Sequence, residues 1–433
     1  MSAMRLRPRW FAYGLLAMVV ATFAALAAFN GFMDSFSLFG SPRMAGINAD
    51  KVTGDVRMTK AWQVARSNYD GIILGTSRAE VGLNPQHAAW QDLNAYNFAM
   101  QGASLYEIYR NLQQAQAAHP VKQVLLGLDF FNFSVDHETP PTFVEERLLV
   151  DRNDVPQDYH YRIRDAVNVL FSEDGFKKSL ETWRTNRYQK GSTHKADGQI
   201  SQARWFSGIR RQGGFRAAFE AFEKNYMRKG GNWLASPDFG YRFHDPATGQ
   251  SSFDTFEALL AFCHEHDIKL VLFTSPVHAR LQLGLYVTGL WDEFADWKRL
   301  LVASNESVAR RYGREPFPMV DFATINAYTK DPLPVGETRD TVTMDGMRWY
   351  WDAAHYRSDL GDVMQDKLFF DTPAPADASF GQPLDGAHLE ANLEAHRQAL
   401  RAYREDYPQE WQAVVERARS LNTLKMAAEA PLP

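Results

Sequence analysis

A serine, an aspartate and a histidine in this 433-residue chain have the side chains that nucleophilic catalysis needs. Ser77 stands in Gly-Thr-Ser-Arg after an apolar run, and Asp352 stands three residues before His355. A serine hydroxyl becomes a nucleophile when a base takes its proton, and an acid must orient that base. A carboxylate at this spacing can hold Nδ1–H of the histidine and leave Nε2 free for the serine. The three residues predict ester or acyl-transfer chemistry.

Each of these motifs has a structural alternative. Ser77 is not in the G-x-S-x-G turn of ordinary α/β-hydrolases, and a serine at a strand-to-helix turn is often a helix cap. A second Asp-x-x-His occurs at Asp385 and His388, before a polar helical segment, where it fits a surface helix cap. The pair Asp352 and His355 is preferred because Gly361 and an apolar helix follow it.

One further histidine, His278, follows a predicted strand and is therefore expected near the ligand edge of the sheet. It either contacts substrate, acts as a hydrogen-bond donor there, or caps the next helix. The histidines at 264 and 266 point in different directions on a helix, so no metal site is predicted, and no nucleotide motif is present. The single cysteine, Cys263, excludes an intramolecular disulfide. No cofactor is predicted.

The elements that would position these residues are short apolar runs separated by helical patterns. Three runs read as buried strands and a weaker fourth covers 318–322; the three are 71–75, 123–128 and 269–274. Helices are expected over 104–118 and 253–266. Apolar strands alternating with helices predict an α/β domain with a parallel sheet covered on both faces.

Residues 134–251 lack strand signals and are charged and aromatic, which predicts a helical insertion. Its aromatic side chains either line a carbohydrate groove or pack the insertion against the sheet. They are Trp183, Trp205, Phe206, Phe219, Phe222 and Trp233.

The N-terminal segment 10–33 carries no charge and is long enough to span a hydrocarbon core of ~30 Å. Arginines at 5, 7 and 9 precede it, which predicts a cytoplasmic N-terminus (1–9), an inner-membrane anchor and an exported domain, periplasmic or extracellular. A cleaved signal peptide and a buried soluble helix are the alternatives. A linker (34–68), the α/β domain (69–371) and a C-terminal helical extension (372–433) are expected to follow.

The order of these motifs resembles the SGNH/GDSL hydrolase superfamily. Ser77 matches its nucleophile block, Gly102 its glycine block, and Asp352 with His355 its final block. Asp129 stands where the family has an asparagine, so Asn132 and His278 are the remaining candidates for that side-chain donor. The resemblance implies a flavodoxin-like three-layer sandwich and an oxyanion hole built from the backbone N–H groups of Ser77 and Gly102 plus a side chain.

With its predicted anchor, the chain resembles the membrane-anchored members of this type, which include proteins of exopolysaccharide O-acetylation. This resemblance implies a serine acylesterase or O-acyltransferase that acts on cell-envelope polysaccharide or lipid-linked sugar, beside a multi-span membrane acyltransferase. A non-catalytic scaffold or glycan-binding module of the same fold is the alternative. The net charge of −5 gives no global basic field, so nucleic acid is not an expected partner.

Overall fold

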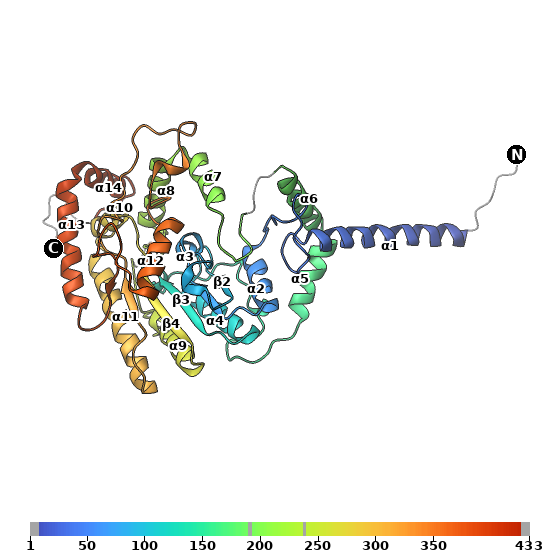
Figure 1. Ribbon diagram of the computed structural model, residues 1–433, viewed down its shortest axis with the longest axis horizontal. Coiled ribbons are helices and arrows are strands. Elements are labelled where there is room, and N and C mark those ends of the chain that lie inside the picture. Colours follow the sequence, from blue (N-terminus) through green and yellow to red (C-terminus); the bar gives the residue numbers. More distant parts are fainter. Residues whose placement is uncertain (1–7, 189–192, 237–239, 426–433) are drawn as a thin grey trace. The chain divides into compact units, whose positions relative to one another are not determined.

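A computed structural model describes residues 8–188, 193–236 and 240–425 of the chain (Figure 1). Residues 1–7, which carry most of the predicted cytoplasmic segment, lie outside this range. The chain divides into two compact units, which are described separately. The first contains Met1–Arg66 and Val144–Lys195, and the second contains Ser67–Phe143 and Ala196–Pro433.

The first unit is helical and is built around the N-terminal apolar helix α1 (Pro8–Met33). Within the described ranges, α1 is the helix that is long and apolar enough to cross a membrane. Its C-terminal turns pack against α5 (His160–Phe171) and α6 (Glu173–Arg187), as Figure 1 shows. The rings of Phe23 and Phe171 lie 6.1 Å apart.

Residues 34–66, expected as a linker, are folded into the first unit. Asp34 is fully buried and its carboxylate accepts a hydrogen bond from Lys51 at 2.8 Å. The helix α2 (Val56–Arg66) buries Met58 against Phe36 and Leu38. These buried charge pairs and apolar contacts hold residues 34–66, most of the segment 34–68 that was expected as a linker, within the first unit.

The second unit contains a six-stranded, mostly parallel sheet. Its strand order is β2-β1-β3-β4-β5-β6. The strands are β1 (Gly71–Leu74), β2 (Ala95–Asn97), β3 (Gln123–Leu128), β4 (Lys269–Thr274), β5 (Met319–Asp321) and β6 (Gln382–Pro383). The four predicted strands are confirmed. The short strands β2 and β6 were not predicted, and β6 pairs antiparallel with β5.

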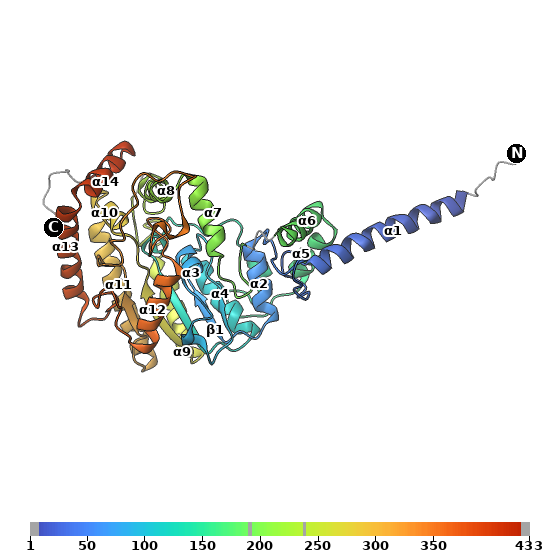
Figure 2. The same cartoon turned by 45° about the horizontal axis from the view of Figure 1, so that its top comes forward.

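Helices pack around this sheet in groups (Figure 2). The helix α9 packs against both α4 and α11, α3 packs against α12, and α7 packs against α8. Their bounds are α3 (Ser77–Gly82), α4 (Leu105–Ala118), α7 (Gln202–Gln212), α8 (Phe215–Met227), α9 (Ser252–Glu265), α10 (Ala279–Val287), α11 (Trp291–Tyr312) and α12 (Ser358–Phe370). Short 3-10 turns are η1 (Ala88–Trp90), η2 (Phe130–Phe133), η3 (Glu145–Arg147) and η4 (Met344–Gly346).

Two predicted segments are divided differently in the structure. The insertion 134–251 is helical, but α5 and α6 belong to the first unit whereas α7 and α8 belong to the second. The C-terminal segment contains α13 (Leu389–Asp406) and α14 (Pro408–Ser420), and it also supplies β6. Because α14 packs on α10 and α13 packs on α11, this segment is part of the second unit and not an appended extension.

Candidate active site

Ser77 is the first residue of α3 and follows β1 by two residues. The chain turns at Gly75, whose φ of +141° is strained for residues with a Cβ, and an added Cβ would lie 3.2 Å from the Gly127 carbonyl oxygen. Thr76 then caps α3 by accepting the Arg78 N–H. This sharp turn presents Ser77, which is partly exposed, at the carboxyl end of β1.

The structure brings Ser77, His355 and Asp352 into one hydrogen-bonded chain. Ser77 Oγ lies 2.7 Å from His355 Nε2. His355 Nδ1 lies 2.8 Å and 3.0 Å from the two carboxylate oxygens of Asp352. Asp352 is fully buried, and the tautomer of His355 that donates Nδ1–H to it has its lone pair on Nε2, facing the serine. This is the geometry in which a histidine can take the serine proton.

The loop that carries the base is held by its own hydrogen bonds. Asp352 Oδ1 also accepts the backbone N–H groups of Ala354 at 2.9 Å and His355 at 3.0 Å. The Trp351 N–H donates to the His355 carbonyl at 2.9 Å, which closes the loop. A single carboxylate therefore fixes both the ring and the backbone of His355.

Two helices that pack against each other position the nucleophile and the base. The helix α3 starts at Ser77, and α12 starts three residues after His355. They approach closely where Gly361 faces Gly82, because a Cβ at Gly361 would lie only 1.9 Å from the Gly82 carbonyl oxygen. This contact explains why a glycine and an apolar helix follow Asp352 and His355 in the sequence.

Asp129 stabilises the turn that carries Ser77, and both of its carboxylate oxygens have hydrogen-bond partners there. One carboxylate oxygen accepts the Thr76 hydroxyl, and the other pairs with Arg78 Nη1 at 2.7 Å. The residues on both sides of Ser77 are thus tied to one buried carboxylate. Asp129 is therefore a positioning residue and not an oxyanion donor, a role that its negative charge also opposes.

Arg78 completes a buried network that the sequence motif did not reveal. Its Nη2 donates to the Tyr226 hydroxyl at 2.9 Å, and Tyr226 comes from α8. Burial, the largest single effect, lowers the pKa of Arg78, but the charge of Asp129 and the interactions with the Tyr226 hydroxyl together raise it above its ordinary value. Burial raises the pKa of Tyr226, so it remains a neutral hydroxyl. The guanidinium of Arg78, the residue after Ser77, is consequently a permanent buried cation.

Aromatic rings from α7 and α8 flank the base. The ring of Trp205 lies 4.7 Å from the imidazole of His355, and that of Phe222 lies 4.9 Å from it. Both are partly exposed, whereas Phe219 and Trp233 are buried and pack the helices. A groove of about 370 Å³ begins at Phe222, with walls from Gln212, Ala217, Ala221 and Asn225. Of the six predicted aromatic side chains, Phe222 lines this groove, whereas Phe219 and Trp233 pack the helices.

The three other candidate oxyanion or substrate residues lie in different surroundings. Gly102 has φ +63° in the exposed loop after β2, and this loop is joined to the nucleophile turn by the Met100 N–H to Gly75 carbonyl bond. Asn132 is buried, and its Oδ1 has no hydrogen-bond partner. It lines a polar cavity of about 200 Å³ with Ser104 and His137.

His278 is a capping residue. Its Nδ1 accepts the Arg280 N–H at 3.2 Å, and its Nε2 lies 2.7 Å from the Asp331 carbonyl oxygen. Burial lowers the pKa of His278 to about 3, so the ring is neutral. With both nitrogens occupied, it has no N–H for an oxyanion, and the helix-capping alternative explains it.

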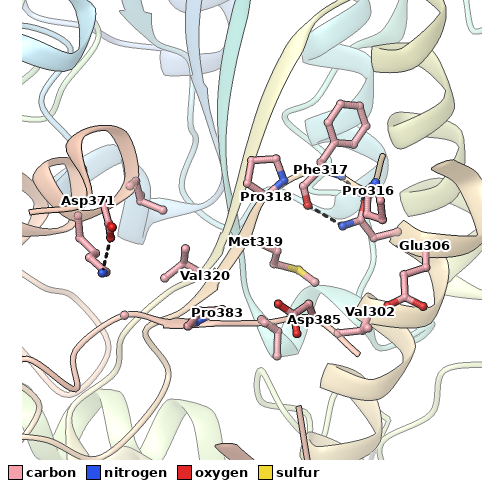
Figure 3. Close-up of a pocket in the computed structure, with 15 residues that line it drawn as sticks. Val302, Glu306, Pro316, Phe317, Pro318, Met319, Val320, Asp371, Pro383 and Asp385 are labelled. Atoms are coloured by element: carbon pink, nitrogen blue, oxygen red, sulfur yellow. Dashed lines mark hydrogen bonds and ion pairs between the residues drawn. The ribbon is translucent and has the colours of Figure 1, made fainter. Parts of the chain in front are cut away.

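The second Asp-x-x-His is a surface feature. Asp385 accepts the N–H groups of Ala387 and His388 just before α13, and both side chains of the pair are about half exposed. Asp385 also lines a cavity of about 480 Å³ around β5 and β6 (Figure 3). The walls of that cavity include Met319, Val320 and Pro383 but none of the residues of the Ser77 chain.

Among the described residues, no group of three His, Cys, Asp or Glu side chains is arranged to hold a metal ion. Cys263 is fully buried, and burial raises the pKa of its thiol. A scan against protein-family models finds no match to the chain. A search of curated proteins likewise finds no match.

Proposed function

We propose that this protein is a membrane-anchored serine acylesterase or O-acyltransferase of SGNH type. The observation that carries the proposal is the hydrogen-bonded chain from Ser77 through His355 to Asp352, with a short bond at each step. The second Asp-x-x-His, at Asp385 and His388, is about half exposed on the surface and is not part of this chain of hydrogen bonds.

In the proposed reaction, Ser77 Oγ attacks the acyl carbonyl while His355 Nε2 takes its proton. Asp352 stabilises the imidazolium that forms, and His355 returns the proton to the departing alcohol oxygen. The resulting acyl-Ser77 is released by water in hydrolysis or by a sugar hydroxyl in transfer, with His355 again acting as base. The N–H groups of Ser77 and Gly102 are the proposed oxyanion donors, as the resemblance implies.

The flavodoxin-like, three-layer assignment is part of the proposal. The first five strands have the order 2-1-3-4-5, which is that of flavodoxin-like doubly wound folds. The step from β1 to β2 runs opposite to the steps that lead on to β5. Right-handed crossovers then place α3 on one face of the sheet and α4, α9 and α11 on the other. The packing of α9 against α4 and α11 supports this division.

The proposed substrate is an O-acylated cell-envelope polysaccharide or lipid-linked sugar. Support comes from α1, which fits a single membrane span, and from the aromatic side chains of Trp205 and Phe222 beside the base. Sugar rings stack on aromatic faces, which makes this pair a suitable entrance wall. The inner-membrane location, the exported second unit and a multi-span acyltransferase as partner complete the proposal.

Covalent labelling with an activated acetyl ester tests the chemistry. The full chain in detergent should acquire one acetyl group on Ser77, seen by peptide mass spectrometry, and should release the ester's leaving group. Ser77→Ala and His355→Ala should lower the rate by about 10⁴-fold or more, as in other triads. His388→Ala is the matched control and should retain the rate. Absence of Ser77-dependent acylation would support the non-catalytic glycan-binding alternative.

A further inference from the structure

The helical hairpin formed by α5 and α6 exposes an apolar stripe that the active site does not use. Tyr159, which is the N-cap of α5, and Ile163, Val167 and Phe171 follow one another at a spacing of four, so each side chain lies beside the next along the helix. Their exposed fractions are 64%, 59%, 49% and 42%. On α6, Phe176 and Trp183 are each 43% exposed and lie two turns apart on one face. Exposed large apolar side chains gathered along a helix in this way mark an interaction site.

The tip of this hairpin contacts α1 inside its apolar segment. Phe171 packs on Phe23, and the rings of Phe176 and Phe29 lie 5.8 Å apart. Asn30 Nδ2 donates to the Leu170 carbonyl at 2.9 Å, which fixes the hairpin against α1. The contacts therefore extend along α1 from Phe23 to Asn30.

The length of α1 fixes the depth of these contacts. Residues 9–25, which are all exposed, rise only about 25 Å at ~1.5 Å per residue. The hydrocarbon core of a bilayer is ~30 Å thick, so a spanning α1 must also use residues after Ala25. Those residues are the ones that the hairpin covers. The hairpin tip consequently lies at the level where the acyl chains meet the headgroups.

We infer that the α5–α6 hairpin is a membrane-interface element whose apolar stripe contacts phospholipid acyl chains. Basic and aromatic side chains of the hairpin fit this placement. Arg184 and Arg187 are exposed and can reach lipid phosphates, whereas Lys177 pairs with the exposed Glu173 at 2.6 Å. Tyr159 and Trp183 are of the types that gather at bilayer interfaces. The inference rests on the proposed anchoring by α1 but not on the proposed catalytic chemistry.

Site-directed fluorescence in vesicles tests this placement. Ile163→Cys and Val167→Cys variants of the full chain carry a polarity-sensitive probe after reconstitution into phosphatidylcholine and phosphatidylglycerol vesicles. The native background suffices because Cys263 is fully buried. Asn168→Cys, exposed on another face of α5, is the matched control, and Leu16→Cys in α1 reports the anchor.

Probes at 163 and 167 should emit at shorter wavelength than the probe at 168. Lipids with a nitroxide near the top of the acyl chain should quench them at least about twofold more strongly. Quenching at Leu16 without quenching at 163 and 167 would overturn the hairpin proposal and leave the anchor in place. Loss of quenching at all positions would overturn both. Protection from aqueous iodide without lipid quenching would assign the stripe to a protein partner instead.

Discussion

At the scale of one residue, Asp129 differs from the asparagine of the motif that the chain resembles, and it stabilises the turn that carries Ser77. The resemblance calls for an asparagine at this position, and an aspartate there cannot donate to an oxyanion. The structure uses the carboxylate to hold Thr76 and Arg78, the two neighbours of Ser77. Sequence reasoning could not find this role because Arg78 and Asp129 are 51 residues apart and the pairing depends on the fold.

Asp129→Asn should therefore destabilise the protein and slow acylation. The buried guanidinium of Arg78 would lose its counter-charge, which costs about 3–5 kcal/mol of unfolding free energy. We expect kcat to fall while KM changes little, because the carboxylate supports the nucleophile and not the substrate. Urea denaturation and acylation kinetics measure the two effects.

The double variant Asp129→Leu with Arg78→Met separates positioning from stability. It removes the buried charge pair entirely, so we expect it to recover part of the lost stability. It should leave kcat low because the Thr76 hydroxyl still lacks its acceptor. Full recovery of kcat together with stability would show that Asp129 is only structural.

The buried His278 should make the unfolding free energy of the protein decrease as the pH falls. Its folded-state pKa of about 3 lies below the ordinary 6.5, so the unfolded chain binds the extra proton first. The contribution is complete above pH 6.5 and is lost as the pH falls toward 3, by about 1.4 kcal/mol per pH unit. Between pH 6.5 and 5, this single group should cost about 2 kcal/mol.

Replacement of His278 tests this linkage. Asn is the suitable residue because it is also a good N-cap for α10. His278→Asn should show a smaller loss of unfolding free energy between pH 6.5 and 5 than the wild type, measured by urea denaturation at both values. An identical pH dependence in the two proteins would contradict the prediction.

At the scale of elements, the prediction of strands was better than the prediction of boundaries. The runs that form β1, β3 and β4 are apolar over most of their length because they are covered on both faces, and this pattern is visible in sequence. The strands β2 and β6 have three and two residues, too few for a pattern. The division of residues 134–251 between two units depends on tertiary contacts, which composition does not encode.

The packing of α3 on α12 is the element-scale contact that aligns the nucleophile with the base. Gly361→Ala places a Cβ against the Gly82 carbonyl and must push the two helices apart. We expect a loss of about 1–3 kcal/mol in unfolding free energy and a fall in the acylation rate, because Ser77 and His355 are attached to these helices.

Gly208→Ala in α7 is the matched control for this contact. An added Cβ there meets no heavy atom within 4 Å. Alanine favours the helix over glycine, so this variant should be neutral or more stable by up to about 1 kcal/mol. Equal effects of the two substitutions on Tm and acylation rate would contradict the proposed alignment.

At the scale of the whole molecule, the central question is whether α1 stays attached to the protein. The sequence is also compatible with a cleaved signal peptide, because alanines at 25, 27 and 28 follow an apolar segment. The last turns of α1 pack on α5 and α6, and Asn30 is bonded to the Leu170 carbonyl, so a retained α1 would be part of the folded first unit. Cleavage near these alanines would remove Phe23 from Phe171 and expose the hairpin tip to water.

We therefore expect the protein purified from membranes to retain residues 10–33. Intact mass spectrometry should give the mass of the uncleaved chain, and carbonate washing should leave the protein in the membrane fraction, as expected for a spanning helix. Asn30→Ala provides a sharper test, because it weakens the contact of α1 with Leu170 while α1 keeps its apolar length. That variant should remain in the membrane but show faster proteolysis of the α5–α6 hairpin. A mature N-terminus between residues 26 and 30 in the wild-type protein would reject the anchor and, with it, the placement of the hairpin at the bilayer.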